Sequence, residues 1–183
     1  MQKEIAISEE RINVLTKNLT FANKINNTAA DKYLRLVTKA LPVNKDFVNI
    51  LAAINDAAID ASVPLNDYVF LVGSLSDETK NIRNTLPVTI TITGGLPEVK
   101  RFIASLKNQL PLSEITDIQI TSTVSTLTIA FYYKPFPEKV SFQPTRPLQN
   151  LTQKERFLIE SLISIDISSR RSALSIQEQL VEQ

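Results

Sequence analysis

The sequence predicts an α+β fold made of two helix–strand–strand units, and three observations support this prediction. Apolar residues recur at helical spacing over 44–62 and 97–110, and they alternate with polar residues over 86–94 and 118–133. The near-copies VPLND (63–67) and LPLSE (110–114) each stand between a helical pattern and a strand pattern. Pro64 and Pro111 disfavour helical geometry in the residue before them, so we expect each copy to end a helix and open a strand.

The first unit covers residues 44–93. Asn44 is a candidate N-cap for a helix that continues to about Ser62. Residues 65–75 indicate a strand, 76–85 a polar connection, and 86–94 a half-buried strand whose threonines face away from its aliphatic residues. The apolar stripe of the helix comprises Phe47, Leu51, Ile54, Ala58 and Ala61.

The second unit covers residues 95–133. Gly94 and Gly95 turn the chain, Pro97 suits a first helical turn, and two alternating strands follow the helix. Two such units bury one face of a sheet under two helices, which predicts a permuted ferredoxin-like sandwich in αββαββ order. Its open sheet face would be rich in threonine, formed by Thr89, Thr91, Thr93, Thr121, Thr123 and Thr128.

Residues 3–41 indicate one long helix, because they contain neither Gly nor Pro. An apolar heptad pattern predicts that residues 1–41 form a coiled-coil stem, although a long helix lying on its own domain also fits the pattern. Asn26 interrupts this seam at an a position, where it either fixes the register or marks a loosening of the seam. The predicted seam comprises Ile5, Ile12, Leu15, Leu19, Asn26, Tyr33 and Leu36.

The chain changes character after residue 137. We therefore predict a stem over 1–41, a ferredoxin-like domain over 42–137, and a Pro-rich connector, short helix and mobile tail over 138–183. Thr152 and Glu155 form a capping box for a helix over 153–165. Its apolar face predicts docking on the chain's own domain or on a partner, since it would otherwise expose a patch of Phe157, Leu158, Leu162 and Ile165.

The composition argues against an enzyme. The chain has no Cys and no His, so thiol chemistry and the commonest general base and metal ligand are absent, and we expect no cofactor and no metal. With 20 Lys and Arg against 19 Asp and Glu, no charge excess favours nucleic-acid binding. No apolar run is long enough to span a membrane and no signal peptide is evident, so we expect any membrane anchor to precede Met1.

Five candidate sites are weaker than their structural interpretations. Gly94 and Gly95, with Lys100 and Arg101 nearby, would suit an anion only with a phosphate-loop pattern that the chain lacks. Asp56 with Asp60, and Glu114 with Asp117, are typical of solvated faces. An RNA-binding sheet would need exposed aromatic residues, and only Tyr132, Tyr68 and Phe70 are candidates. Arg83 lies too far from a strand end to serve an acylphosphatase-like loop.

Three segments resemble the PilO family of type IV pilus assembly proteins. They are ALPVNKDFVNILAAINDAAIDASVPL (40–65), LPVTITITGGLPEVKRFIASLKNQLP (86–111) and ITDIQITSTVSTLTIAFYYKP (115–135). The resemblance spans roughly residues 1–135 and consists of fold patterns without catalytic motifs. It implies a membrane anchor, a coiled-coil stem and a permuted ferredoxin-like domain outside the cytoplasm. The chain departs from the family in lacking the anchor.

The resemblance implies a mechanical function. The protein would belong to the alignment subcomplex of a pilus machine, form a homodimer or a heterodimer with a PilN-like partner, and link the inner-membrane platform to the outer parts. It would lie on the periplasmic side of the inner membrane, together with other pilus assembly subunits. Two alternatives remain open at this point: a type II secretion subunit of the same fold, and an ACT-like module that binds a small-molecule regulator.

Overall fold

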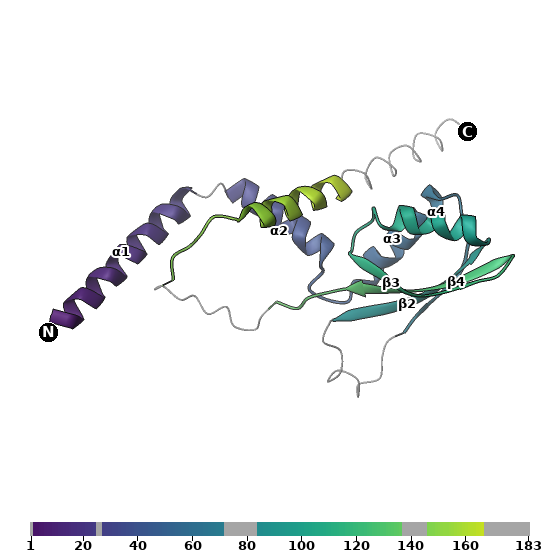
Figure 1. Cartoon of the computed structure of the whole chain (residues 1–183), viewed down its shortest axis with the longest axis horizontal. Coiled ribbons are helices and arrows are strands. Elements are labelled where there is room, and N and C mark those ends of the chain that lie inside the picture. Colours follow the sequence, from purple (N-terminus) through teal and green to yellow (C-terminus); the bar gives the residue numbers. More distant parts are fainter. Residues whose placement is uncertain (1, 25–26, 72–83, 137–145, 167–183) are drawn as a thin grey trace.

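The computed structural model describes residues 2–24, 27–71, 84–136 and 146–166. Figure 1 shows α1 and α2, which we call the stem, leading into a domain made of a sheet and two covering helices. Residues 153–166 are also helical and lie beside α2. In chain order the elements are α1 (Gln2–Lys24), α2 (Asn27–Ala40), α3 (Phe47–Asp60), β1 (Leu65–Phe70), β2 (Thr85–Thr93), α4 (Leu96–Leu106), β3 (Ser113–Ile120) and β4 (Val124–Tyr132).

The sheet has four antiparallel strands in the order β1-β2-β4-β3. Moving the last strand of the chain to the front converts αββαββ into βαββαβ, which is the ferredoxin-like order. The predicted permuted ferredoxin-like fold is therefore confirmed. The alternating segments 86–94 and 126–133 correspond to the central strands, β2 and β4, while β1 and β3 form the edges.

The main core lies between the sheet and the helices α3 and α4. In β2, every second side chain is fully buried, and each lies directly opposite a buried residue of β4 in the register. Phe102 of α4 and Ile54 of α3 close this core from the helix side, each with no exposed surface. Burying such side chains is the main favourable term in folding, at about 1.5–3 kcal/mol each. The strand residues involved are Leu86, Val88, Ile90, Ile92, Leu127, Ile129 and Phe131.

The other face of the sheet carries the threonines, as predicted for β2. Thr89 and Thr128 lie opposite each other on β2 and β4, and their hydroxyl oxygens are 3.3 Å apart. Tyr132 also lies on this face, since it pairs with Thr85. Tyr68 and Phe70 face the helix layer instead, because they pair with the buried Ile90 and Val88.

Both proline phrases lie where the sequence places them. Pro64 stands between α3 and β1, and Pro111 stands between α4 and β3. The N-cap of α3 is Asp46 rather than the predicted Asn44: its carboxylate accepts a hydrogen bond from the backbone N–H of Asn49 at 3.1 Å. A carboxylate at this position also interacts favourably with the helix dipole, which an amide does not.

The single helix predicted over 3–41 is described as two helices, α1 and α2, whose axes differ in direction (Figure 1). Ile25 and Asn26 lie outside the described residues. The sequence Ile-Asn-Asn-Thr at 25–28 has a lower intrinsic helix propensity than its surroundings, because β-branched residues and Asn favour helix interiors less than Ala or Leu.

The turn between β2 and α4 requires Gly94. Its φ is +136°, a conformation that L side chains rarely adopt, and an added Cβ would lie 2.2 Å from Cγ of Glu98. Gly95, the N-cap of α4, has φ −98°, and its added Cβ would come no closer than 3.5 Å to the carbonyl oxygen of Thr121. The two adjacent glycines therefore differ sharply in what they tolerate.

We predict that Gly94→Ala lowers the free energy of unfolding by about 1–3 kcal/mol, the usual cost of a strained backbone conformation. Gly95→Ala is the matched control and should cost less, about 0.5 kcal/mol, the difference between Gly and Ala at an N-cap. Urea unfolding followed by far-UV circular dichroism measures both. Equal losses for the two variants would contradict this account of the turn.

Candidate protein–protein interface

The stem exposes a row of large apolar side chains on α1. Ile5, Ile12 and Leu19 recur every seven residues and are 58%, 62% and 62% exposed, and Leu15 between them is 45% exposed. We call these four residues the stem stripe. Such a row is unfavourable in water, and its spacing is that of a helix that packs against another helix.

The structure places the remaining seam residues differently. Tyr33 is partly exposed on α2, at 38%, and Asn26 lies outside the described residues. Leu36 is only 8% exposed because it packs inside the same chain. The predicted seam is thus divided into an open part on α1 and a covered part near the end of α2.

The 153–166 helix covers that second part. Leu36 and Ala40 of α2, together with Leu110, form a small cluster against its Ile159, Leu162, Ile163 and Ile165. The helix begins with the predicted capping box: Glu155 accepts from the backbone N–H of Thr152 at 2.7 Å, and the Thr152 hydroxyl accepts from the N–H of Glu155 at 3.3 Å. The Glu155 carboxylate accepts hydrogen bonds from the backbone N–H of Thr152 and, at 2.8 Å, from the Thr152 hydroxyl, and these two bonds lower its pKa. The helix therefore docks within the chain, on α2 and Leu110, through Leu162 and Ile165 of its predicted face. The other two residues of that face, Phe157 and Leu158, stay exposed at 66% and 55%.

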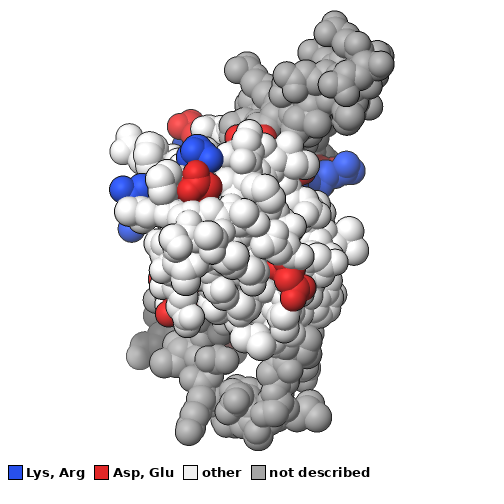
Figure 2. Space-filling view, turned by 90° about the vertical axis from the view of Figure 1, so that its right-hand side faces the viewer, with Lys and Arg blue, Asp and Glu red and all other residues white. Residues whose placement is uncertain are grey.

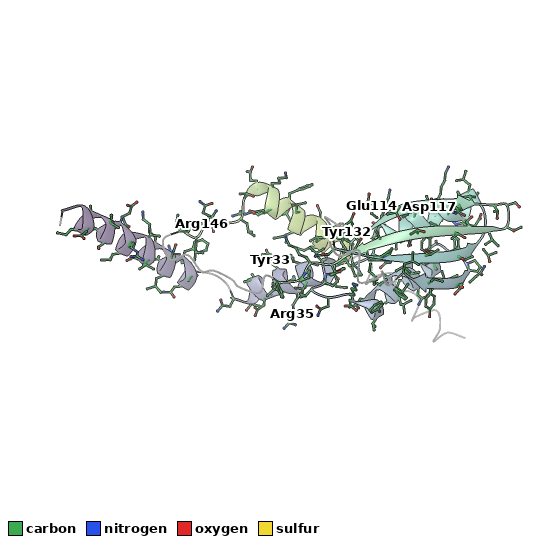
Figure 3. All side chains as sticks on the ribbon, turned by 90° about the horizontal axis from the view of Figure 1, so that it is seen from below. Tyr33, Arg35, Glu114, Asp117, Tyr132 and Arg146 are labelled. Atoms are coloured by element: carbon green, nitrogen blue, oxygen red, sulfur yellow. The ribbon has the colours of Figure 1, made fainter. Side chains whose placement is uncertain are left out.

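Asn18 of α1 holds the chain segment that leads into this helix. Its side chain is 5% exposed, donates to the carbonyl oxygen of Arg146 at 3.1 Å and accepts from the N–H of Leu148 at 2.8 Å. Figure 3 labels Arg146 beside the end of α1. Sequence reasoning missed this residue, although one signal was present. Asn18 stands between Val14 and Phe21 at helical spacing, on a face adjacent to the stem stripe.

Charged groups meet where α2, α3 and the 153–166 helix approach one another. Lys39 Nζ lies 2.6 Å from Asp166 Oδ1, and a groove of about 290 Å³ beside this pair is also lined by Lys32, Tyr33 and Arg35. Burial, and then the negative charge of Asp60, raise the pKa of Asp56, while Lys39 opposes this shift. Asp60 in turn accepts hydrogen bonds from Ser105 and Gln109, so it joins α3 to α4.

The sheet edges offer a second interaction surface. Both edge strands are irregular, with register shifts between Leu65 and Asp67 in β1 and between Ile115 and Asp117 in β3. Bulges of this kind, and charged side chains on an edge strand, disfavour pairing of that strand with a strand of another chain. The four described strands contain no Lys or Arg, and Tyr132 donates a hydrogen bond to Glu114 near the β3 edge (Figure 3). This edge is therefore acidic rather than suited to nucleic acid.

The start of α4 is not an anion site. The carboxylate of Glu98 already accepts from the N–H of Gly95 at 3.0 Å, and Arg101 pairs with Glu98 at 3.3 Å. Hydrogen bonds from the backbone N–H groups of Glu98 itself and of Gly95 lower the pKa of Glu98. The helix terminus is thus satisfied by the chain's own carboxylate.

No catalytic arrangement appears among the described residues. Within that part of the chain, no three acidic residues gather closely enough to hold a metal ion. Its helices also include none that is both long and apolar enough to cross a membrane. Figure 2 views the end of the molecule opposite the N-terminus, where the described surface is mostly uncharged. What the described surface offers is an apolar stem and two sheet edges.

The fold of the chain is similar to that of a solved structure. The crystal structure of the type 4 fimbrial biogenesis protein PilO from Pseudomonas aeruginosa is 14% identical, and the match covers 68% of this chain and 97% of that chain with a TM-score of 0.40. No family model matches the sequence, and no curated protein matches it. The sheet order and the αββαββ order of the chain, rather than this match, define the fold.

We predict that Asn18→Ala frees the segment 146–151 from the stem. The variant leaves the Leu148 N–H and the Arg146 carbonyl without their partner, at a cost of about 1–3 kcal/mol. Hydrogen exchange of the 146–151 amides should accelerate, while exchange in β2 and β4 stays unchanged. Asn13→Ala, on an exposed part of α1, is the control. Equal exchange in the two variants would show that the Asn18 contacts do not hold the segment.

We predict that Asp56→Asn stabilises the protein at neutral pH. The raised pKa means that the folded state disfavours the carboxylate, so this destabilisation is absent in acid and appears as the pH rises through the pKa of the folded state. The stability gain of the variant over the wild type should therefore grow from acid to neutral pH. Ala52→Asn, at an exposed position of the same helix, should show no such trend in melting temperature. A gain that is independent of pH would contradict the assignment.

Proposed function

We propose that this chain is a non-catalytic structural subunit of the type IV pilus assembly machine, related in kind to PilO. It would pair with itself or with a PilN-like partner and help to link the inner-membrane platform to the outer parts of the machine. One observation supports this most strongly: the open stem stripe on a helical stem that leads directly into a permuted ferredoxin-like domain.

The stripe supports a scaffold role because it has the form of a helix interface. Four large aliphatic side chains at heptad spacing, each 45% exposed or more, would lose their unfavourable contact with water when a partner helix covers them. Each side chain covered to the extent seen in a protein core contributes on the order of 1–3 kcal/mol, so a stem of this length is sufficient for pairing.

The pilus assignment draws on the sequence. The segments 40–65, 86–111 and 115–135 resemble the PilO family, and they form α3 with its flanking turns, β2 with α4, and β3 with β4. The resemblance therefore follows the elements of the fold in order. On this proposal the stem covers 1–41 and the domain 42–137, and the protein works on the periplasmic side of the inner membrane, held by an anchor that precedes this chain.

Domain pairing would add to the pairing of the stems. The β1 and β3 edges each retain unpaired backbone groups on one side, and the domains would associate weakly alone and more firmly when the stems hold them together, since tethering raises their effective concentration. The bulges at both edges are consistent with a weak contact that does not extend into an open-ended sheet.

We predict that Ile12→Asp combined with Leu19→Asp dissociates the complex while the domain stays folded. A seam without charged partners opposes the burial of carboxylates, so self-association should weaken at least about ten-fold. Light scattering measures the mass, and circular dichroism reports the sheet. Val48→Asp, at an α3 position that is 77% exposed, is the matched control and should leave the mass unchanged.

The same pair of variants tests the partner. A PilN-like protein encoded beside this chain should co-purify with the wild type and with Val48→Asp, and be lost from the double stem variant. A wild-type chain that remains monomeric and ignores such a partner at high micromolar concentration would contradict the proposed function.

A further inference from the structure

One part of the stem is open, and the chain's own C-terminal segment covers another part. The stem stripe is open, whereas Asn18, Leu36 and Ala40 are buried, at 5%, 8% and 1% exposure. Asn18 contacts the segment 146–148, and Leu36 and Ala40 contact the 153–166 helix. The covered part thus extends from Asn18, near the end of α1, to the end of α2.

The covering segment runs parallel to the stem. Residues 146–148 meet Asn18 near the end of α1, and Asp166, at the other end of the segment, meets Lys39 at the end of α2. Sequence separations across these contacts are 130 for Leu148 with Asn18 and 127 for Asp166 with Lys39. The two chain segments therefore run in the same direction, and of the covering segment only 153–166 is helical. Figure 1 shows the 153–166 helix beside α2, with the two helices crossing at an angle.

This segment lies where a partner helix would otherwise lie. Leu36 and Ala40 belong to the d and a positions of the predicted heptads, so they are the residues that a second parallel stem would need. A partner helix cannot pack on Leu36 while Ile159, Leu162 and Ile163 fill that face. The stem stripe on α1 is free of this conflict, since all four of its residues are exposed.

We propose that residues 146–166 take the place of a second stem by covering Asn18, Leu36 and Ala40. A second copy of the chain therefore pairs through the stem stripe of α1 and is kept away from the end of α2. The inference rests on the proposed function in one respect, that the stem stripe pairs. Its other part, the covering of α2 by the chain itself, stands independently of any partner.

The absence of Cys from the sequence allows a clean test in the full chain. Leu19→Cys, on the stripe, should form a disulfide-linked dimer under mild oxidation, and Leu36→Cys should not. Leu34→Cys, at an exposed position of α2, reports random collisions. Adding Leu162→Asp to Leu36→Cys removes an apolar contact of the covering helix, so the crosslink at position 36 should then appear, with a rise of at least about ten-fold over the collision control.

Hydrogen exchange separates the covering helix from pairing. Leu162→Asp alone should accelerate amide exchange over 153–166 and leave the mass in solution unchanged, whereas Leu19→Asp should lower the mass and leave that exchange unchanged. A crosslink in the Leu36→Cys single variant, or its absence even after Leu162→Asp is added, would overturn the inference, as would loss of association on Leu162→Asp.

The outcome for the stripe is read separately. If the Leu19→Cys variant does not crosslink and the wild-type chain does not associate, pairing through the stem fails along with the proposed function, and the exchange data alone decide whether 146–166 cover the stem. Crosslinking of the Leu19→Cys variant to a different protein, and not to a second copy, would overturn pairing between two copies through the stem stripe.

Discussion

The junction at Ala40–Pro42 is the constraint on which the arrangement of stem, domain and C-terminal segment depends. The carbonyl of Ala40 accepts from Leu112 N–H at 2.8 Å, and that of Pro42 accepts from Lys134 N–H at 2.7 Å. Ala40 is 1% exposed and belongs to the cluster that receives the 153–166 helix. Since Leu112 precedes β3 and Lys134 follows β4, the end of the stem is tied to both strands of one half of the sheet, and the direction of α2 is set by the domain.

This junction explains why the stem is covered near the domain and open farther from it. Near the domain, Leu110 and the 153–166 helix supply apolar partners for α2, so Leu36 and Ala40 are satisfied within the chain. Farther out, the segment around Arg146–Leu148 contacts α1 through Asn18, and the stem stripe keeps its exposure. Apolar surface is thus left open at a distance from the domain, where a partner's helix meets no competing segment among the described residues of this chain.

The sequence predicted the domain well because its signals are local. Alternation in β2 and β4, the proline phrases and the glycine turn each act over a few residues, and together they define αββαββ. The strand order completes the fold, but edges were not predictable: residues 118–120 alternate much as β4 does, and only pairing shows that they lie in the edge strand β3. The N-cap was misplaced by two residues, because Asn44 and Asp46 are both good caps in isolation.

The candidate interface was harder to predict, because heptads do not say which chain supplies the second helix. Leu36 and Leu19 have equivalent patterns in the sequence, yet one contacts residues more than a hundred positions away in the same chain and the other is open. The capping box at Thr152 and the apolar face of the following helix indicated a docked helix. Asn18 was the residue that could have indicated where on the stem the C-terminal segment binds, since a polar residue in an apolar row needs a hydrogen-bond partner. A long-range contact of this kind decides which helix covers the stem. Where the chain's own C-terminal segment reaches the stem, it excludes a partner's helix, because its effective concentration exceeds that of a separate molecule.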